Sequence, residues 1–327
     1  MSIASGVFKR VLVGRPQRSD RLGESLLPKR LALPVFASDA LSSVAYATEQ
    51  ILLVLSAGGL ALLHYTWYAA AGVAFLMLVV VASYRQNVHA YPSGGGDYEV
   101  ASVNLGRRAG VTVASALMVD YVLTVAVSVS SGVANITSAV QSLQGHEVVL
   151  AVVIVLIIML LNLRGVRESG TAFAIPTYAF IAGVAVLIAV GFSKLFTGHH
   201  LVAESAGLHV VHPKHYVGFA LVFLLLRSFA SGCTALTGVE AISNGVPAFR
   251  KPKSKNAATT LALLGALAVT MFLAITALAI HSHVHVADNA VDLGQHVAIA
   301  QIQEGLIEIA LHLFQFGLGL FDGGGVL

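Results

Sequence analysis

Charge and cysteine are scarce in this sequence. Asp, Glu, Lys and Arg make up 11% of the 327 residues, whereas a soluble domain of average composition carries about a quarter. Apolar residues make up 57%, and the mean hydropathy is +0.82. The single cysteine, Cys233, excludes a disulfide framework and a Cys-x-x-Cys metal pair. A chain with so little charge must show an apolar surface to its surroundings, so we predict an all-α integral membrane protein.

Long apolar runs take the place of the missing charge. Seven stretches approach the ~17–25 residues that a membrane-spanning helix needs. They cover residues 31–55, 66–83, 110–140, 148–163, 171–192, 217–246 and 257–280. A weaker eighth stretch, 297–320, carries Glu304 and Glu308, and the sequence stops soon after it. We therefore predict about seven to eight transmembrane helices.

These stretches divide the chain into four parts. Residues 1–30 form a basic N-terminal arm, residues 31–192 hold transmembrane helices 1–5, and residues 217–280 hold helices 6–7. Residues 297–327 are predicted to be a divergent or truncated eighth helix. Lys9 and Arg10 interrupt any early apolar run, so the arm is not expected to be a signal peptide.

Basic residues are sorted by loop. Sixteen of the 19 Lys and Arg residues lie in the arm or in the connections that follow the second, fourth and sixth spans. Positive residues therefore alternate side with every span, as the positive-inside rule requires. The pattern predicts a multi-pass protein of the plasma membrane with a cytoplasmic N-terminus. It also accounts for the sequence pI near 9.0 without a nucleic-acid partner.

Histidines gather in two outer loops instead. They are His199, His200, His209, His212 and His215 in one loop, and His281, His283, His285 and His296 in the next. A His-x-His-x-His run can bind Zn²⁺, but no carboxylate or thiol framework fixes a geometry there. We interpret both as solvated loops and expect neither a transition metal nor a cofactor.

Asp39 is the first of three carboxylates near the middle of predicted spans. An ionisable side chain there costs roughly 2.5–3.5 kcal/mol on insertion scales, which makes it a functional candidate. On a helix, Ser43 and Tyr46 share the face of Asp39 at i+4 and i+7. In a bilayer these oxygens must face protein, water or an ion.

Asp120 begins a similar stripe in the third span. Thr124 and Ser128 follow it at intervals of four residues, and Tyr121 lies alongside. The two hydroxyls can instead bond to the carbonyl four residues earlier, a common use in membrane helices. That alternative leaves Asp120 unexplained.

Glu240 lies in a sixth span that three glycines, at positions 232, 238 and 245, predispose to break. Thr237 shares its face. We predict that the first and sixth spans are both interrupted, and their separation by five helices is that of an inverted repeat. Carboxylate, hydroxyl and carbonyl oxygens suit a hard cation, and each carboxyl can bind a proton instead.

A triglycine segment occurs between the second and third spans, in Tyr91-Pro-Ser-Gly-Gly-Gly-Asp-Tyr98. Three glycines can cradle phosphate, but no strand precedes them and no Lys-Ser/Thr follows. A flexible hinge into the third span fits better.

Six motifs carry a wider similarity. They are Ser38-Asp-Ala-Leu-Ser-Ser-Val-Ala-Tyr46, Tyr84-Arg-Gln, Tyr91-Pro-x-Gly-Gly-Gly-x-Tyr98, Val119-Asp-Tyr-x-Leu-Thr-Val-Ala-Val-Ser128, Leu161-Asn-Leu-Arg-Gly165 and Ser231-Gly-Cys-x-Ala-Leu-Thr-Gly-Val-Glu-Ala-Ile-Ser-Asn244. The chain resembles the amino acid–polyamine–organocation superfamily, most of all its KimA-type, KUP-related potassium importers.

The resemblance implies the LeuT-type fold of two inverted five-helix repeats and proton-coupled potassium uptake by a homodimer in the lipid bilayer. It places the potassium and coupling positions on Asp39, Tyr46, Asp120, Tyr121, Thr124, Ser128, Thr237 and Glu240. Members of the family continue through twelve spans and a cytoplasmic domain. Residues 301–327 do not resemble the expected eighth span, so we expect a C-terminally truncated chain that does not transport alone.

Two alternatives stay open. An amino acid permease of the same superfamily would hold the substrate carboxylate on helix N-termini, with few acidic groups pointing inward. The chain can also be a non-transporting membrane fragment or sensor. An enzyme is not expected, because the histidines lie almost entirely in outer loops rather than at membrane depth.

Overall fold

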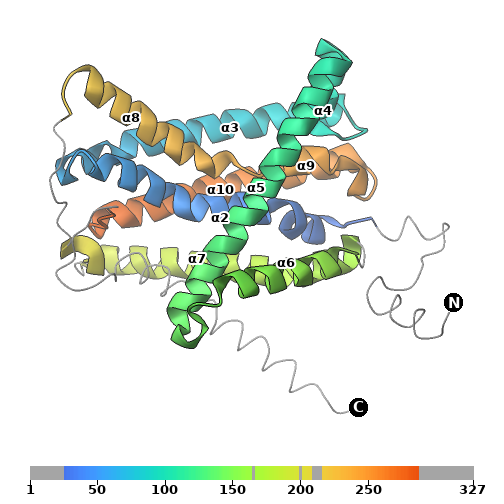
Figure 1. The fold of residues 1–327 in the computed structure, drawn as a ribbon. Helices are drawn as coiled ribbons and strands as arrows, with labels where there is room; N and C mark the ends of the chain where they lie inside the picture. Colours follow the sequence, from blue (N-terminus) through green and yellow to red (C-terminus); the bar gives the residue numbers. More distant parts are fainter. Residues whose placement is uncertain (1–25, 164–165, 199–200, 208–215, 287–327) are drawn as a thin grey trace. The chain divides into compact units, whose positions relative to one another are not determined.

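Helices make up nearly all of the chain that the structure describes. The structure is a computed structural model and describes residues 26–163, 166–198, 201–207 and 216–286. Its α-helices (Figure 1) are α2 (Lys29–Ser56), α3 (Thr66–Ala90), α4 (Gly96–Leu105), α5 (Arg107–Ala139), α6 (Glu147–Leu163), α7 (Val166–Phe196), α8 (Phe219–Gly232), α9 (Ala241–Asn244) and α10 (Lys253–His281). Over these residues the only β pairing is an isolated bridge. The all-α prediction is confirmed.

Six helical segments of the described chain are long and apolar enough to cross a membrane. They are Lys29–Ser56, Leu60–Ala90, Arg107–Ala139, Gly170–Phe196, Phe219–Asn244 and Lys253–His281. They correspond to the first, second, third, fifth, sixth and seventh predicted spans. The fourth corresponds to α6, whose 17 residues stand at the lower limit for a span. The count of seven stays a prediction. The predicted eighth helix and most of the N-terminal arm lie outside the described residues.

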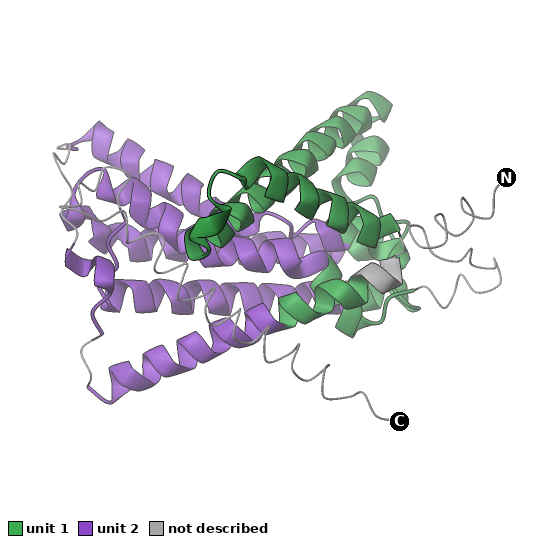
Figure 2. Ribbon diagram, turned by 60° about the horizontal axis from the view of Figure 1, so that its bottom comes forward, with its two compact units in different colours: residues 1–35, 87–178, 243–257 green, residues 36–86, 179–242, 258–327 purple. Residues whose placement is uncertain are grey.

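The chain divides into two compact units (Figure 2). Unit 1 comprises residues 1–35, 87–178 and 243–257, and unit 2 comprises residues 36–86, 179–242 and 258–327.

Large apolar side chains fill the interior of unit 2. The fully buried ones include Leu41, Ile51, Leu55, Val73, Met77, Leu261, Leu264 and Phe272. Glycine lets neighbouring helices approach closely, because a Cβ at Gly265 would lie only 2.9 Å from Val81 Cγ1. Thr48 and Thr276 join α2 to α10 through buried hydroxyls whose oxygens are 2.7 Å apart.

Two segments that precede helices are tied together in unit 1. The Leu27 amide donates to the Ala248 carbonyl over 2.8 Å, and the Arg250 amide donates to the Leu27 carbonyl over 3.2 Å. Leu27 and Phe249 form the isolated bridge and are fully buried. The start of α2 is therefore fixed beside the start of α10.

The predicted interruption of the first span is wrong. α2 is a continuous helix from Lys29 to Ser56 that passes through the serine-rich segment without a break. The serines do not require unwinding, because Ser42 Oγ donates to the Asp39 carbonyl over 2.9 Å within the helix. No glycine interrupts α2, whereas the sixth span has three.

Candidate functional site

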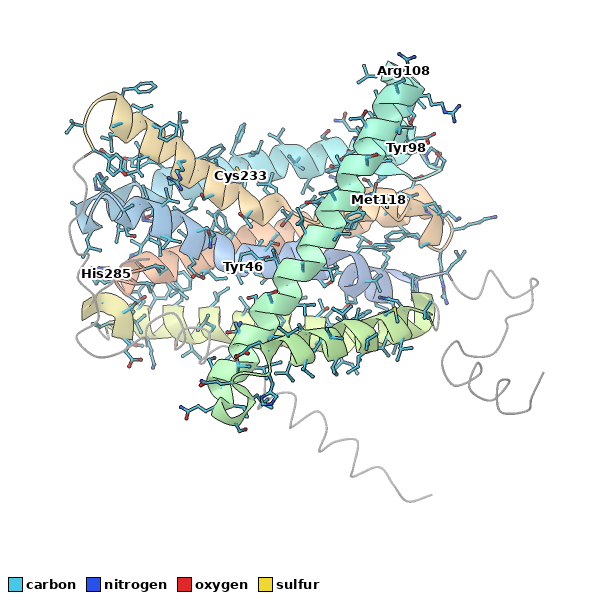
Figure 3. All side chains as sticks on the ribbon, in the orientation of Figure 1. Tyr46, Tyr98, Arg108, Met118, Cys233 and His285 are labelled. Carbon is cyan, nitrogen blue, oxygen red and sulfur yellow. The ribbon has the colours of Figure 1, made fainter. Side chains whose placement is uncertain are left out.

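The polar face of α2 carries the first predicted site residues. Ser43 is completely buried, and its Oγ lies 3.0 Å from Tyr46 Oη. Asp39 lies one turn before Ser43 on the same helix and is half-buried. Tyr46 is labelled on α2 in Figure 3. A continuous helix thus places these three side chains on one face, as their spacing predicts.

The sixth span is broken where its glycines occur. α8 ends at Gly232, a 3₁₀ turn covers Cys233–Leu236, and α9 begins only at Ala241. Figure 3 labels Cys233 at the end of α8. Gly238 has a φ of +80°, a left-handed conformation that residues with a Cβ rarely adopt. The chain therefore leaves α-helical geometry in the middle of an apolar span.

The break rests directly against α2. A Cβ at Gly238 would lie 2.6 Å from Asp39 Oδ2 and 2.9 Å from the Ala40 nitrogen. One residue earlier, Thr237 Oγ1 donates to Ser43 Oγ over 2.7 Å. Glycine is thus required at position 238 for two reasons: the backbone has a positive φ, and Asp39 occupies the space that a Cβ would need.

These contacts assemble a group of oxygens inside unit 2. Asp39, Ser43, Tyr46 and Thr237 form what we call the α2 cluster. Glu240 follows in the same unit, half-buried, immediately before α9. The α2 cluster supplies a carboxylate and three hydroxyls beside a non-helical backbone, and all of these are ligand types of hard cations.

α5 carries the second set of predicted residues, in unit 1. Asp120, Tyr121 and Ser128 are exposed, and Thr124 is half-buried. Most of α5 is exposed, although it is long and apolar enough to span a membrane. A carboxylate on such a helix is expensive in lipid, so Asp120 stays a functional candidate.

The hydroxyls of α5 fall into two groups. Thr112 and Ser115 donate to the carbonyl four residues earlier, over 3.1 and 2.9 Å. Within the described chain, Thr124 and Ser128 make no such bond. Among the described residues, the alternative in which Thr124 and Ser128 bond to their own helix is therefore not supported.

Asn244 is a residue that the sequence did not single out for a role. Its Nδ2 donates to Tyr121 Oη over 2.6 Å, which links the end of α9 to α5 within unit 1. The sequence signal was its place at the end of the longest motif, in the last residues of the sixth span. That place gives no indication of its partner, because the contact joins residues 123 positions apart.

The nine predicted residues thus form two sets. The α2 cluster and Glu240 belong to unit 2, and the stripe of α5 belongs to unit 1. That the sets share one site remains a prediction. Among the described residues, no three His, Cys, Asp or Glu side chains gather so as to hold a metal ion.

The comparisons with known proteins agree on one family. The family model for amino acid permease matches residues 32–313. The potassium transporter KimA of Bacillus subtilis (strain 168) is 49% identical over 272 residues, which cover 83% of this chain and 44% of that protein. This chain therefore spans less than half the length of that relative.

Proposed function

We propose that this chain, which belongs to the amino acid permease family, carries the cation-binding residues of a secondary transporter that imports potassium in symport with protons. The observation that carries the proposal is the α2 cluster, in which Thr237 and Gly238 of a broken span contact Ser43 and Asp39 of α2. An irregular backbone beside a carboxylate is how transporters coordinate small cations in a membrane.

The chemistry of the donors favours potassium over an amino acid. Hydroxyl, carboxylate and backbone oxygens are ligands of hard cations. Asp39, Asp120 and Glu240 would also repel the carboxylate of an amino acid. The relative named as a potassium transporter supports the same substrate. Amino acid transport is the second candidate, because the matching family model is named for amino acid permeases.

Proton coupling is proposed from the position of the carboxyl groups. Asp120 and Glu240 lie in apolar spans, and acidic side chains at such depths form the proton relays of pumps and transporters. A carboxyl that exchanges a proton for a cation couples the two movements through competition for one group.

The setting of the transporter is part of the proposal. The alternating distribution of Lys and Arg supports a plasma-membrane protein with a cytoplasmic N-terminus. A homodimer is proposed from the family resemblance, with lipid as the surrounding partner. The LeuT-type arrangement of two inverted repeats is proposed on the same ground.

Thermal unfolding of the purified chain in detergent tests the substrate. Potassium chloride is compared with choline chloride at equal ionic strength, and then with neutral amino acids. A ligand present at 100 times its dissociation constant stabilises by about 2.7 kcal/mol, so potassium should raise the unfolding temperature and choline should not. Asp39→Asn should weaken the response, and Glu204→Gln, in a 3₁₀ turn outside the spans, should leave it unchanged.

Two outcomes decide against potassium. Stabilisation by an amino acid and not by potassium would establish the second candidate. Equal unfolding temperatures in potassium and choline would refute a cation site on this chain.

A further inference from the structure

The triglycine segment adopts a conformation that only glycine tolerates well. Gly94, Gly95 and Gly96 have φ values of +82°, +88° and +47°, all in the left-handed region. The segment turns the chain from α3 into α4, which begins at Gly96. The sequence predicted a flexible hinge here, but these glycines are in close contact with another part of unit 1.

The partner of the triglycine segment is Asn244 with its neighbours. The Gly95 amide donates to the Asn244 carbonyl over 3.5 Å. A Cβ at Gly94 would collide with Pro247 and lie 3.1 Å from the same carbonyl. A Cβ at Gly96 would collide with Asn244 Oδ1 and lie 2.8 Å from Ser243 Oγ. A side chain at Gly96 would therefore displace Asn244, and one at Gly94 would displace Pro247 and crowd the Asn244 carbonyl.

The side chain of Asn244 is fixed on both sides. Its Nδ2 donates to Tyr121 Oη over 2.6 Å. Its Oδ1 is buried against Gly96 and has no hydrogen-bond partner among the described residues. If the amide were turned by 180°, Nδ2 would be the unpaired atom instead. A buried polar atom without a partner is destabilising, so the surrounding contacts must impose this position of the amide.

We propose that Asn244 is a positioning residue: the triglycine segment holds its amide, and the amide holds the Tyr121 hydroxyl where the cation binds. This inference rests on the proposed function. It adds to the site a residue that acts through Tyr121. It also makes the loop between α3 and α4 a determinant of cation affinity, since a shift of Gly96 would move Asn244 and then Tyr121.

The plain alternative is that Asn244 only ends the short helix α9. In that case its replacement lowers stability equally with and without cation. If Asn244 has a positioning role, its replacement raises the half-saturating potassium concentration, and this effect depends on the Tyr121 hydroxyl. The two roles therefore separate in a double-mutant cycle read by potassium titration.

The experiment titrates the purified 327-residue chain with potassium chloride against choline chloride and follows thermal unfolding. Asn244→Leu, which keeps the size and removes the hydrogen bonds, is combined with Tyr121→Phe. Asn244→Leu alone should raise the half-saturating potassium concentration about two- to ten-fold, the effect of one lost hydrogen bond. Tyr121→Phe removes a proposed cation ligand and should raise it at least as much. The double variant should show no rise beyond that of Tyr121→Phe. Asn244→Ala repeats the test if Asn244→Leu fails to fold.

Gly96→Ala and Gly106→Ala supply a matched pair of variants at the two ends of α4. Both glycines have positive φ, but a Cβ at Gly106 would have no atom within 4 Å. Gly96→Ala should raise the half-saturating potassium concentration. Gly106→Ala should lower the stability of the chain and leave that concentration unchanged.

The outcomes separate this inference from the proposed function. An unaltered chain that does not respond to potassium refutes the function. A chain that responds, with Asn244→Leu responding at the same concentration, overturns the positioning role. Strictly additive shifts in the double variant overturn it as well.

Discussion

Gly238→Ala tests whether the broken sixth span rests against Asp39. The added methyl group meets two penalties in the structure. The backbone has a φ of +80°, and a residue with a Cβ costs roughly 1–2 kcal/mol there. The Cβ would also lie 2.6 Å from Asp39 Oδ2 and 2.9 Å from the Ala40 nitrogen, and overpacking costs about 1–3 kcal/mol. We expect a loss of about 3 kcal/mol in the free energy of unfolding.

Two other glycines separate these penalties. Gly145 has a φ of +83° and open space around it, so Gly145→Ala measures the backbone penalty alone, about 1 kcal/mol. Gly132 lies within α5 and has no atom within 4 Å of an added Cβ. Gly132→Ala is expected to be neutral or to stabilise by up to about 1 kcal/mol, because alanine favours a helix.

The assay is unfolding in mixed micelles titrated with a denaturing detergent, followed by circular dichroism. The same three variants are then titrated with potassium. Gly238→Ala should also raise the half-saturating potassium concentration, because the methyl group displaces the Asp39 carboxylate, and neither control should do so. A loss for Gly238→Ala no larger than that for Gly145→Ala would refute the close approach of this backbone to Asp39.

Thr48→Val should lower the free energy of unfolding by about 1 kcal/mol, because it leaves the buried Thr276 hydroxyl without its partner at 2.7 Å. A double variant, Thr48→Val with Thr276→Val, whose loss equals the sum of the two single losses would contradict this. The half-saturating potassium concentration should rise as the pH falls, because protons compete for the carboxylates. Asp120→Asn or Glu240→Gln should flatten this dependence and Glu204→Gln should not, and an unchanged pH profile in both would exclude them from coupling. Cells that lack potassium importers and express these 327 residues should accumulate no rubidium, because the aligned residues cover 44% of the length of the potassium transporter they match; robust accumulation would contradict this.

The spans were predictable because length and apolar content decide them locally. The break at Gly238 was predictable in kind, since glycine lowers helical stability wherever it occurs. The continuity of α2 was not predicted, because Ser38, Asp39, Ser42 and Ser43 interrupt its apolar run. In the structure, Ser42 bonds to its own helix and Ser43 is buried beside Tyr46 and Thr237. In α2 these two serines therefore mark contacts and not a break.

Spacing and residue type select the candidate site residues, whose roles stay predictions, but they do not give the contacts between residues far apart in the sequence. Spacing on a helix places Ser43 and Tyr46 together, and no tertiary information is needed for that. The hydrogen bond between Asn244 and Tyr121 depends on how α5 lies beside the end of α9, which one sequence does not encode in any local pattern. Helix α4 was missed for a related reason: its ten residues are too short and too polar to give a span signal.

The pairing of Leu27 with residues 248–250 has a consequence for biosynthesis. The ribosome makes Leu27 about 220 residues before its partners, and at roughly 5–20 residues per second the interval is about 10 to 45 seconds. During that time the segment that precedes α2 lacks the backbone groups to which Leu27 bonds. The hydrogen bonds at the start of the described chain therefore cannot form until residues 248–250 have been made.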